Sequence, residues 1–239
     1  MPGYYFIAWQ NRWLFFIGFR FFLYLKRKKG DVLSSDNRVW VIIAATFGAL
    51  LGSRLIGGLE NPEQLSKSGN WFIYFYMNKT VLGGLLGGLF GVELVKKIIG
   101  VKDASGDLFV YPMILALIIG RIGCFSMGIH EETYGLPTSA VLGMDLGDGT
   151  ARHPVTIYEI VYLILLWLLL WMLSKRMILA NGALFKLFMI GYIMFRFFLE
   201  CIKPHYKYSI GLSAIQVACL TGVIWYAPYL IKPKRLLQQ

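Results

Sequence analysis

The stretch "IYEIVYLILLWLLLWMLSKR", residues 157–176, is an almost unbroken apolar run that ends in a Lys-Arg pair. A helix of about 20 apolar residues crosses the ~30 Å of hydrocarbon in a bilayer. The run up to Met172 has almost no polar side chain that could face water. It therefore predicts a transmembrane helix, and an integral membrane protein around it.

The composition of the whole chain favours the same class. Of its 239 residues, 57% are hydrophobic and only 15% are charged, and the mean hydropathy is +0.59. A soluble domain rarely has so little charge. The net charge of +11 would suggest a nucleic-acid partner in a soluble protein. Here the basic residues lie between apolar runs, which predicts contact with membrane lipids and no nucleic-acid partner.

Cysteine usage and the N-terminal sequence exclude other classes. Cys124, Cys201 and Cys219 form no CxxC pair and lie in or beside apolar runs. This pattern argues against a disulfide framework or a zinc site, and no metal or soluble cofactor is predicted. The first residues lack the basic region and the small-residue cleavage site of a signal peptide.

Seven apolar segments predict an all-α membrane protein with seven transmembrane helices. No internal repeat or soluble domain is visible, so residues 1–239 are interpreted as a single membrane domain. The first segment is the weakest, because polar and charged residues interrupt it. The segments cover roughly residues 5–25, 39–59, 80–99, 108–127, 156–173, 183–202 and 210–231.

The basic residues predict the orientation of these helices. Most of the Lys and Arg residues between the segments follow the first, third, fifth and seventh segments. Positive residues accumulate on the cytoplasmic side, so the N-terminus is predicted outside and the C-terminus inside. The aromatic segment 70–79 is expected to lie along the outer interface. Residues 128–155, rich in Gly, Pro, Asp and Thr, are expected to form a folded outer-face loop.

Glycines recur every four residues in "TVLGGLLGGLFGVEL", residues 80–94. Gly83, Gly87 and Gly91 form one such series, and Gly84 begins a second. Such a pattern is typical of a helix-packing face, where two backbones approach closely. A bare backbone also admits a lipid head group, and the two interpretations are compatible.

Six ionisable residues lie within the predicted spans, where each costs about 2.5–3.5 kcal/mol on insertion scales. Such residues usually face a partner or a cavity. One alternative is that the arginines tie helices together through carboxylates. The other is that a surplus of arginines binds an anion, which at this depth is a phospholipid head group. The six residues are Arg54, Glu93, Arg121, Glu159, Arg196 and Glu200.

These residues are expected to play different parts. Arg196 and Glu200 are four residues apart and could pair on one helix face. Glu93 is expected to be solvated at the cytoplasmic end. Arg54, Arg121 and Arg196 are expected to converge on the outer leaflet, because their segments bring them to the same depth.

The stretch "RHPVTIYE", residues 152–159, closes the outer loop and opens the fifth segment. Pro154 suits a first helical turn. His153 is either a loop histidine bonded to the backbone, or an acid–base or capping group at the mouth of a site.

Together these motifs resemble the prolipoprotein diacylglyceryl transferases. The resemblance covers roughly residues 40–205 and rests on "GRIGCF", "TYG", "RHPVTIYE" and "GYIMFRFFLE" in this order, with "LGGLLGG" one span earlier. It implies a bacterial plasma-membrane enzyme with seven helices and its N-terminus outside. It also implies two substrates, phosphatidylglycerol and the lipobox cysteine of a prolipoprotein peptide, with glycerol phosphate released.

The resemblance assigns site residues by motif. Arg121 matches the essential arginine, and Arg196 is expected to bind the lipid phosphate with it, joined less surely by Arg54. Tyr192 is expected to bond to the lipid, and Glu132 or His153 to handle the proton. The remaining substrate-binding candidates are Gly83, Gly84, Gly135, Tyr158 and Glu159.

Two positions depart from the family pattern. Cys124 stands where relatives usually have asparagine, and Leu82 where they have a histidine before the Gly-Gly pair. Another base, such as His130, His153 or Glu132, would then be needed. The alternatives are a relative that uses the same phospholipid site with a different acceptor, and a non-enzymatic lipid-binding membrane protein.

Overall fold

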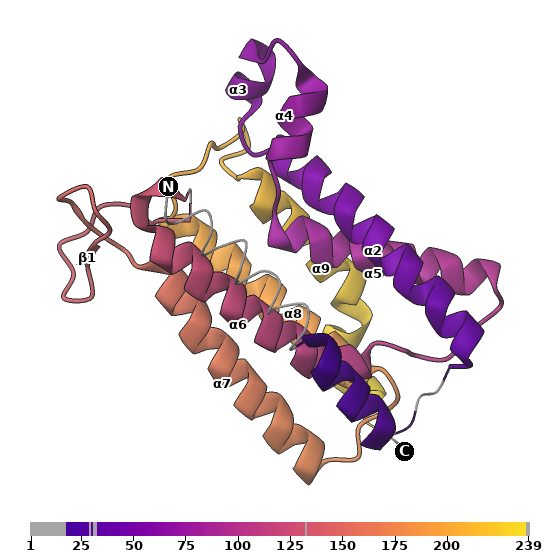
Figure 1. Ribbon diagram of the computed structural model, residues 1–239. Helices are drawn as coiled ribbons and strands as arrows, with labels where there is room; N and C mark the ends of the chain where they lie inside the picture. The colour runs from indigo at the N-terminus through magenta and orange to yellow at the C-terminus, as the bar shows by residue number, and fades with distance from the viewer. Residues whose placement is uncertain (1–17, 29, 31–32, 132, 238–239) are drawn as a thin grey trace.

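The computed structural model describes residues 18–28, 30, 33–131 and 133–237, which are helical apart from a two-stranded ribbon and the connecting loops (Figure 1). Residues 18–28 are helical. The longer helices are α2 (Ser35–Gly58), α5 (Val81–Ile98), α6 (Val110–Met127), α7 (Val155–Arg176), α8 (Ala183–Leu199) and α9 (Ala214–Ile231). The shorter elements are α3 (Pro62–Lys67), α4 (Trp71–Met77), η1 (Asp107–Phe109), η2 (Gly128–His130), β1 (Met144–Asp145), β2 (Ala151–Arg152), η3 (Glu200–Ile202) and η4 (Pro233–Leu236).

Six predicted apolar segments coincide with helices within a few residues. The first segment is helical where it is described, and residues 5–17 lie outside the described part. Four of the described helices are long and apolar enough to cross a membrane. Helix α8 has only 17 residues, and α5 has three charged residues in its last turns. The four candidates are Asp36–Gly58, Asp107–His130, Val155–Arg176 and Ala214–Ile231.

Local capping explains where several helices begin. The Thr80 side chain accepts a hydrogen bond from the backbone N–H of Gly83 at the start of α5. At the start of α9, Ser213 and Gln216 form a reciprocal capping box. These side chains satisfy backbone N–H groups that have no partner within the helix.

Helices α2 and α5 pack against each other along their glycines. A Cβ atom on Gly83 would collide with the carbonyl of Gly52, and one on Gly87 with the carbonyl of Gly48. Gly91 meets Ala44 in the same way. The predicted helix-packing face is therefore confirmed, and its partner is a matching small-residue series on α2.

Helix α7 packs against both α6 and α8, and α9 packs against α8 and the α2–α5 pair. In Figure 1, α7 lies at the edge of the bundle beside α6. The core between them is apolar, with Leu163 and Phe188 fully buried. Many large apolar side chains point outward instead, such as Ile224, which is 73% exposed. Exposed apolar surface on this scale suits contact with lipid rather than with water.

The described residues of the segment 128–155 include a short two-stranded ribbon. Strands β1 and β2 pair antiparallel, and the Asp145 carboxylate accepts hydrogen bonds from three backbone N–H groups of the turn between them. The backbone N–H of Leu136 donates to the carbonyl of Ile202 at 2.8 Å. The loop is thus fastened to the end of α8, at what we call the ribbon end of the molecule.

Candidate functional site

The carboxylate of Glu159 joins three helices at the ribbon end. Its Oε2 lies 2.9 Å from Nε of Arg121 and 3.3 Å from Nη1 of Arg196. Its Oε1 accepts a hydrogen bond from the Tyr192 hydroxyl at 2.8 Å. Glu159 is only 1% exposed and Tyr192 is fully buried. We call these four residues the Glu159 cluster.

The positions of these side chains follow from the helices that hold them. Glu159 lies in the second turn of α7, directly after the ribbon, and α7 contacts both α6 and α8. Arg121 projects from α6, while Tyr192 and Arg196 are four residues apart on α8 and share a face. One carboxylate can therefore reach a guanidinium on each side.

A second carboxylate extends the cluster beyond the end of α8. Nη2 of Arg196 lies 3.2 Å from Oε2 of Glu200, and Nε2 of His205 lies 3.1 Å from Oε1. Burial, together with Lys203 and Arg196, lowers the pKa of His205 to about 3. The imidazole is therefore neutral near pH 7, and neither its Nε2 nor Oε1 of Glu200 makes a hydrogen bond with the described residues.

Of the three arginines predicted to converge, Arg121 and Arg196 lie together, beside Tyr192, and Arg54 does not join them. The predicted arginine surplus is not what the contacts show, because Glu159 lies between the two arginines and Glu200 pairs with the second. The arginines therefore do tie helices together, as the first alternative required. Each guanidinium still has five N–H donors, so a carboxylate contact leaves others for a ligand.

His153 and Tyr158 lie beside this cluster at the start of α7. The Nδ1 of His153 lies 3.2 Å from the Tyr158 hydroxyl, and the His153 carbonyl accepts from the N–H of Gly135 at 3.2 Å. A side chain on Gly135 would collide with His153, so this close approach requires glycine. Glu132 lies outside the described residues. His130 is exposed at the end of η2.

Arg54 contacts a different part of the molecule. Its Nη1 donates to the backbone carbonyl of Tyr76, and its guanidinium lies 4.8 Å from the centre of the Tyr76 ring. Gly83 faces α2, as described above, whereas a Cβ on Gly84 would have its nearest neighbours at 3.7 Å. The described contacts thus place neither Arg54 nor Gly83 in the Glu159 cluster.

The two positions that depart from the family pattern have distinct surroundings. Nη1 of Arg121 lies 3.9 Å from Sγ of Cys124, one turn along α6. Leu82 is 1% exposed and belongs to the same hydrophobic cluster as Tyr192. An apolar side chain therefore fills the place that the resemblance gives to a histidine.

Two residues near the cluster were missed by the sequence reasoning. The sequence pattern singled out neither Lys203 nor His205. Both follow Glu200 closely, and the 200–203 spacing of three is the signal that could have drawn attention to Lys203.

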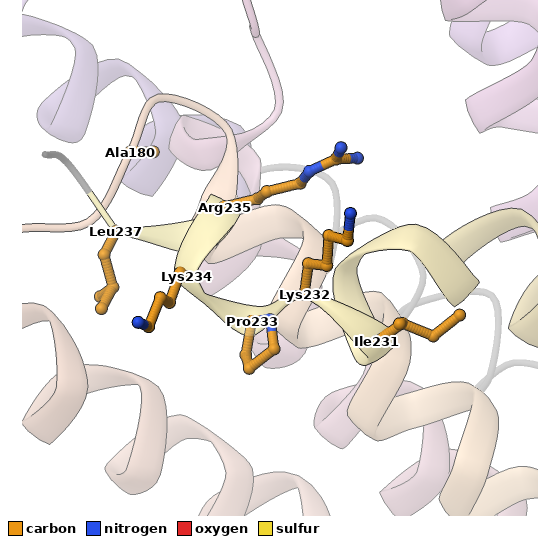
Figure 2. A pocket seen from close by; sticks show the side chains of 7 residues that line it. All are labelled: Ala180, Ile231, Lys232, Pro233, Lys234, Arg235 and Leu237. Atoms are coloured by element: carbon orange, nitrogen blue, oxygen red, sulfur yellow. The ribbon is translucent and has the colours of Figure 1, made fainter.

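Two pockets of the described part lie at the opposite end of the bundle. Figure 2 shows the first, a pocket of about 680 Å³ where the end of α9 and η4 meet Ala180. Lys232, Lys234 and Arg235 line it, and Lys175 and Arg176 line the second. The predicted cavity beside Arg121 therefore stays a prediction.

Comparison with known proteins shows the family of this chain. Residues 13–231 match the sequence profile of the family described as prolipoprotein diacylglyceryl transferase. The chain belongs to this family. The match covers the helices that carry the Glu159 cluster.

Named relatives share this family. The phosphatidylglycerol–prolipoprotein diacylglyceryl transferase of Treponema denticola is 27% identical over 91% of this chain and 82% of its own. The enzyme of the same name from Clostridium tetani is 29% identical over 83% of this chain and 82% of its own. The one from Bordetella bronchiseptica is 34% identical over 67% of this chain and 62% of its own. At this distance the family is shown, while each residue's role needs its own argument.

Proposed function

We propose that this protein transfers the diacylglyceryl group of phosphatidylglycerol to the lipobox cysteine of a prolipoprotein in the bacterial plasma membrane. It does so from seven membrane spans, with the N-terminus and the ribbon end outside. The observation that carries this proposal is the buried Glu159 cluster, which holds two arginines at one depth in a chain of this family.

The chemistry suits charged groups that are fixed in advance. The lipobox thiolate attacks C3 of the diacylglycerol moiety, a C–S bond forms, and the C–O bond to phosphate breaks. Glycerol phosphate leaves with the electron pair as an anion. Arg121 and Arg196 stabilise that anion, and Glu159 keeps the two guanidinium groups in place before the lipid arrives.

The thiol must also lose its proton, which requires a base. The pKa of a free cysteine is about 8.5, and nearby cations lower it. His153 is the described candidate, with its ring oriented by Tyr158, and Glu132 is the other. Tyr192, Gly84 and Gly135 complete the surroundings of the lipid in this proposal.

A second function is favoured by one observation, the buried Leu82. In the place of the family's histidine, an apolar side chain cannot transfer a proton. The same phospholipid site would then serve a different acceptor, one that needs less activation than a thiol.

One experiment separates these functions. The purified protein is incubated with phosphatidylglycerol labelled in its acyl chains and a lipobox peptide, with a Cys→Ser peptide as the control. We expect labelled cysteine peptide and released glycerol phosphate. Consumption of lipid without peptide product would favour a different acceptor, and lipid binding without turnover would contradict both enzymatic proposals.

A further inference from the structure

Lys203 is buried beside the Glu159 cluster but has no ionic contact of its own. The residue follows η3 directly and is only 7% exposed. Within the described part of the chain, no carboxylate lies at ion-pair distance from its ammonium group. Lysine is almost never buried without a partner. The described chain supplies no anion to this ammonium group, so a bound ligand could supply it.

The neighbouring carboxylates lie against other groups. Glu159 contacts two arginines and a tyrosine, and Oε2 of Glu200 pairs with Arg196. Oε1 of Glu200 lies 3.1 Å from Nε2 of His205 and makes no hydrogen bond with the described residues. Glu60 attracts Lys203 only from beyond ion-pair distance. The positive charge of Lys203 therefore remains available to a ligand.

A second donor in the same region is also unsatisfied. Nε of Arg196 is enclosed by protein and makes no hydrogen bond with the described residues. Arg196 lies in the last turn of α8, and Lys203 follows η3, which continues directly from that helix. Two cationic groups with donors that lack acceptors, in one region of the fold, favour the binding of an oxyanion.

We propose that Lys203 binds the phosphate group of the phospholipid substrate, together with Arg196. The choice of phosphatidylglycerol as the ligand rests on the proposed function. The inference that the ligand carries a phosphate group rests only on the charges around Lys203. The same chemistry would suit the phosphodiester of the lipid or free glycerol phosphate, the released product.

The ionisation of Lys203 gives this site a characteristic pH dependence. Burial and the charge of Arg196 lower the pKa of Lys203 to about 8. An anion requires the protonated amine, so its affinity is complete well below pH 8. Above pH 8 the free site loses the proton, and affinity should fall about tenfold per pH unit.

The other charged groups facing Lys203 do not produce this dependence. The charged groups that act on Lys203 are Arg121, Arg196, Glu200 and Glu60. Arginine side chains in general stay protonated between pH 7 and 9, and carboxylates in general stay ionised. The pKa of His205 lies near 3, so its ring stays neutral. A change in ligand affinity near pH 8 would therefore indicate the loss of the proton from Lys203.

The test compares the full-length protein with three variants in detergent micelles. Lys203→Met removes the charge, Lys203→Arg keeps it at all pH values of interest, and Lys207→Met changes an exposed lysine of the same loop as the matched control. Calorimetry at pH 7, 8 and 9 measures binding of short-chain phosphatidylglycerol, short-chain phosphatidylcholine, glycerol phosphate and inorganic phosphate. Thermal unfolding shows that each variant is folded.

We expect Lys203→Met to weaken phosphatidylglycerol binding at pH 7 by at least about tenfold, since it removes a buried charge–charge contact. Lys203→Arg should retain binding and lose the decline above pH 8, and Lys207→Met should match the unmodified protein. If the site accepts the lipid, phosphatidylglycerol binds most tightly of the four compounds. If it accepts only the released product, glycerol phosphate is the one compound that binds.

Unchanged affinity and an unchanged pH curve in Lys203→Met would overturn the proposal, as would a flat pH curve in the unmodified protein. Peptide lipidation by the same preparations keeps the two proposals apart. Lys203-dependent phosphate binding without lipidation would contradict only the proposed function. Lipidation with the same KM for lipid in Lys203→Met as in the unmodified protein would contradict only the Lys203 site.

Discussion

Glu159→Gln tests whether one carboxylate holds α6, α7 and α8 together. Glutamine keeps the shape of the side chain and can still accept the Tyr192 hydrogen bond through its amide oxygen. It removes the negative charge between Arg121 and Arg196, which lie 2.9 and 3.3 Å from the same oxygen. Arg121 then loses its ion-pair partner, whereas Arg196 keeps Glu200.

The size of the effect follows from burial. Removing one partner of a buried ion pair typically costs about 3–5 kcal/mol, because the other charge remains buried without compensation. Since Arg196 keeps one carboxylate, we expect a loss near the lower limit, about 3 kcal/mol in the free energy of unfolding. That loss corresponds to roughly a 100-fold decrease in the ratio of folded to unfolded protein.

Glu93→Gln is the matched control. Glu93 pairs with Lys96 at 3.2 Å, but its side chain is 46% exposed. Exposed pairs contribute about 0–1 kcal/mol, so this variant should lose no more than that. Unfolding in mixed micelles with increasing dodecyl sulfate, followed by circular dichroism, gives both free energies. A loss in Glu159→Gln no greater than in Glu93→Gln would refute a structural role for the cluster.

Three further predictions follow from the same contacts. Arg121→Ala and Arg121→Lys should each abolish most peptide lipidation, because neither alanine nor lysine reproduces the guanidinium fork. Both variants should still fold, because Glu159 keeps its ion pair with Arg196. Near-normal activity of either variant would exclude the phosphate role. Gly87→Ile should destabilise the α2–α5 contact by more than about 1 kcal/mol in the same unfolding assay, while Gly84→Ala should be close to neutral. Leu82→His should raise lipidation per folded molecule if a base is missing; an unchanged or lower rate would favour a different acceptor.

Much of the helical architecture could be predicted from local sequence. The apolar segment 80–99 corresponds to α5, and the segment 183–202 corresponds to α8 with η3. The helical structure of such segments is decided locally, because an apolar run of this length forms a helix wherever it is shielded from water. The glycine series also predicted close packing, although not that α2 would be the partner.

The Glu159 cluster illustrates the part that local sequence could not decide. Arg121, Glu159 and Arg196 stand out as charged residues in apolar runs, and the family resemblance drew attention to them. Whether they would bind a lipid or each other depends on how three separate helices pack. The structure places one carboxylate between both arginines, so the expected arginine surplus was wrong.

What the sequence by itself determined is the membrane class, the position of most helices and the charged residues worth testing, because hydrophobic length and residue type are properties of short segments. What only the tertiary structure decided is which charges neutralise each other. Lys203 was an ordinary loop lysine in the sequence, and folding buries it beside Arg196 without a carboxylate of its own. Coulomb energies depend on distance and burial, and both are set by contacts between helices that are far apart in the chain.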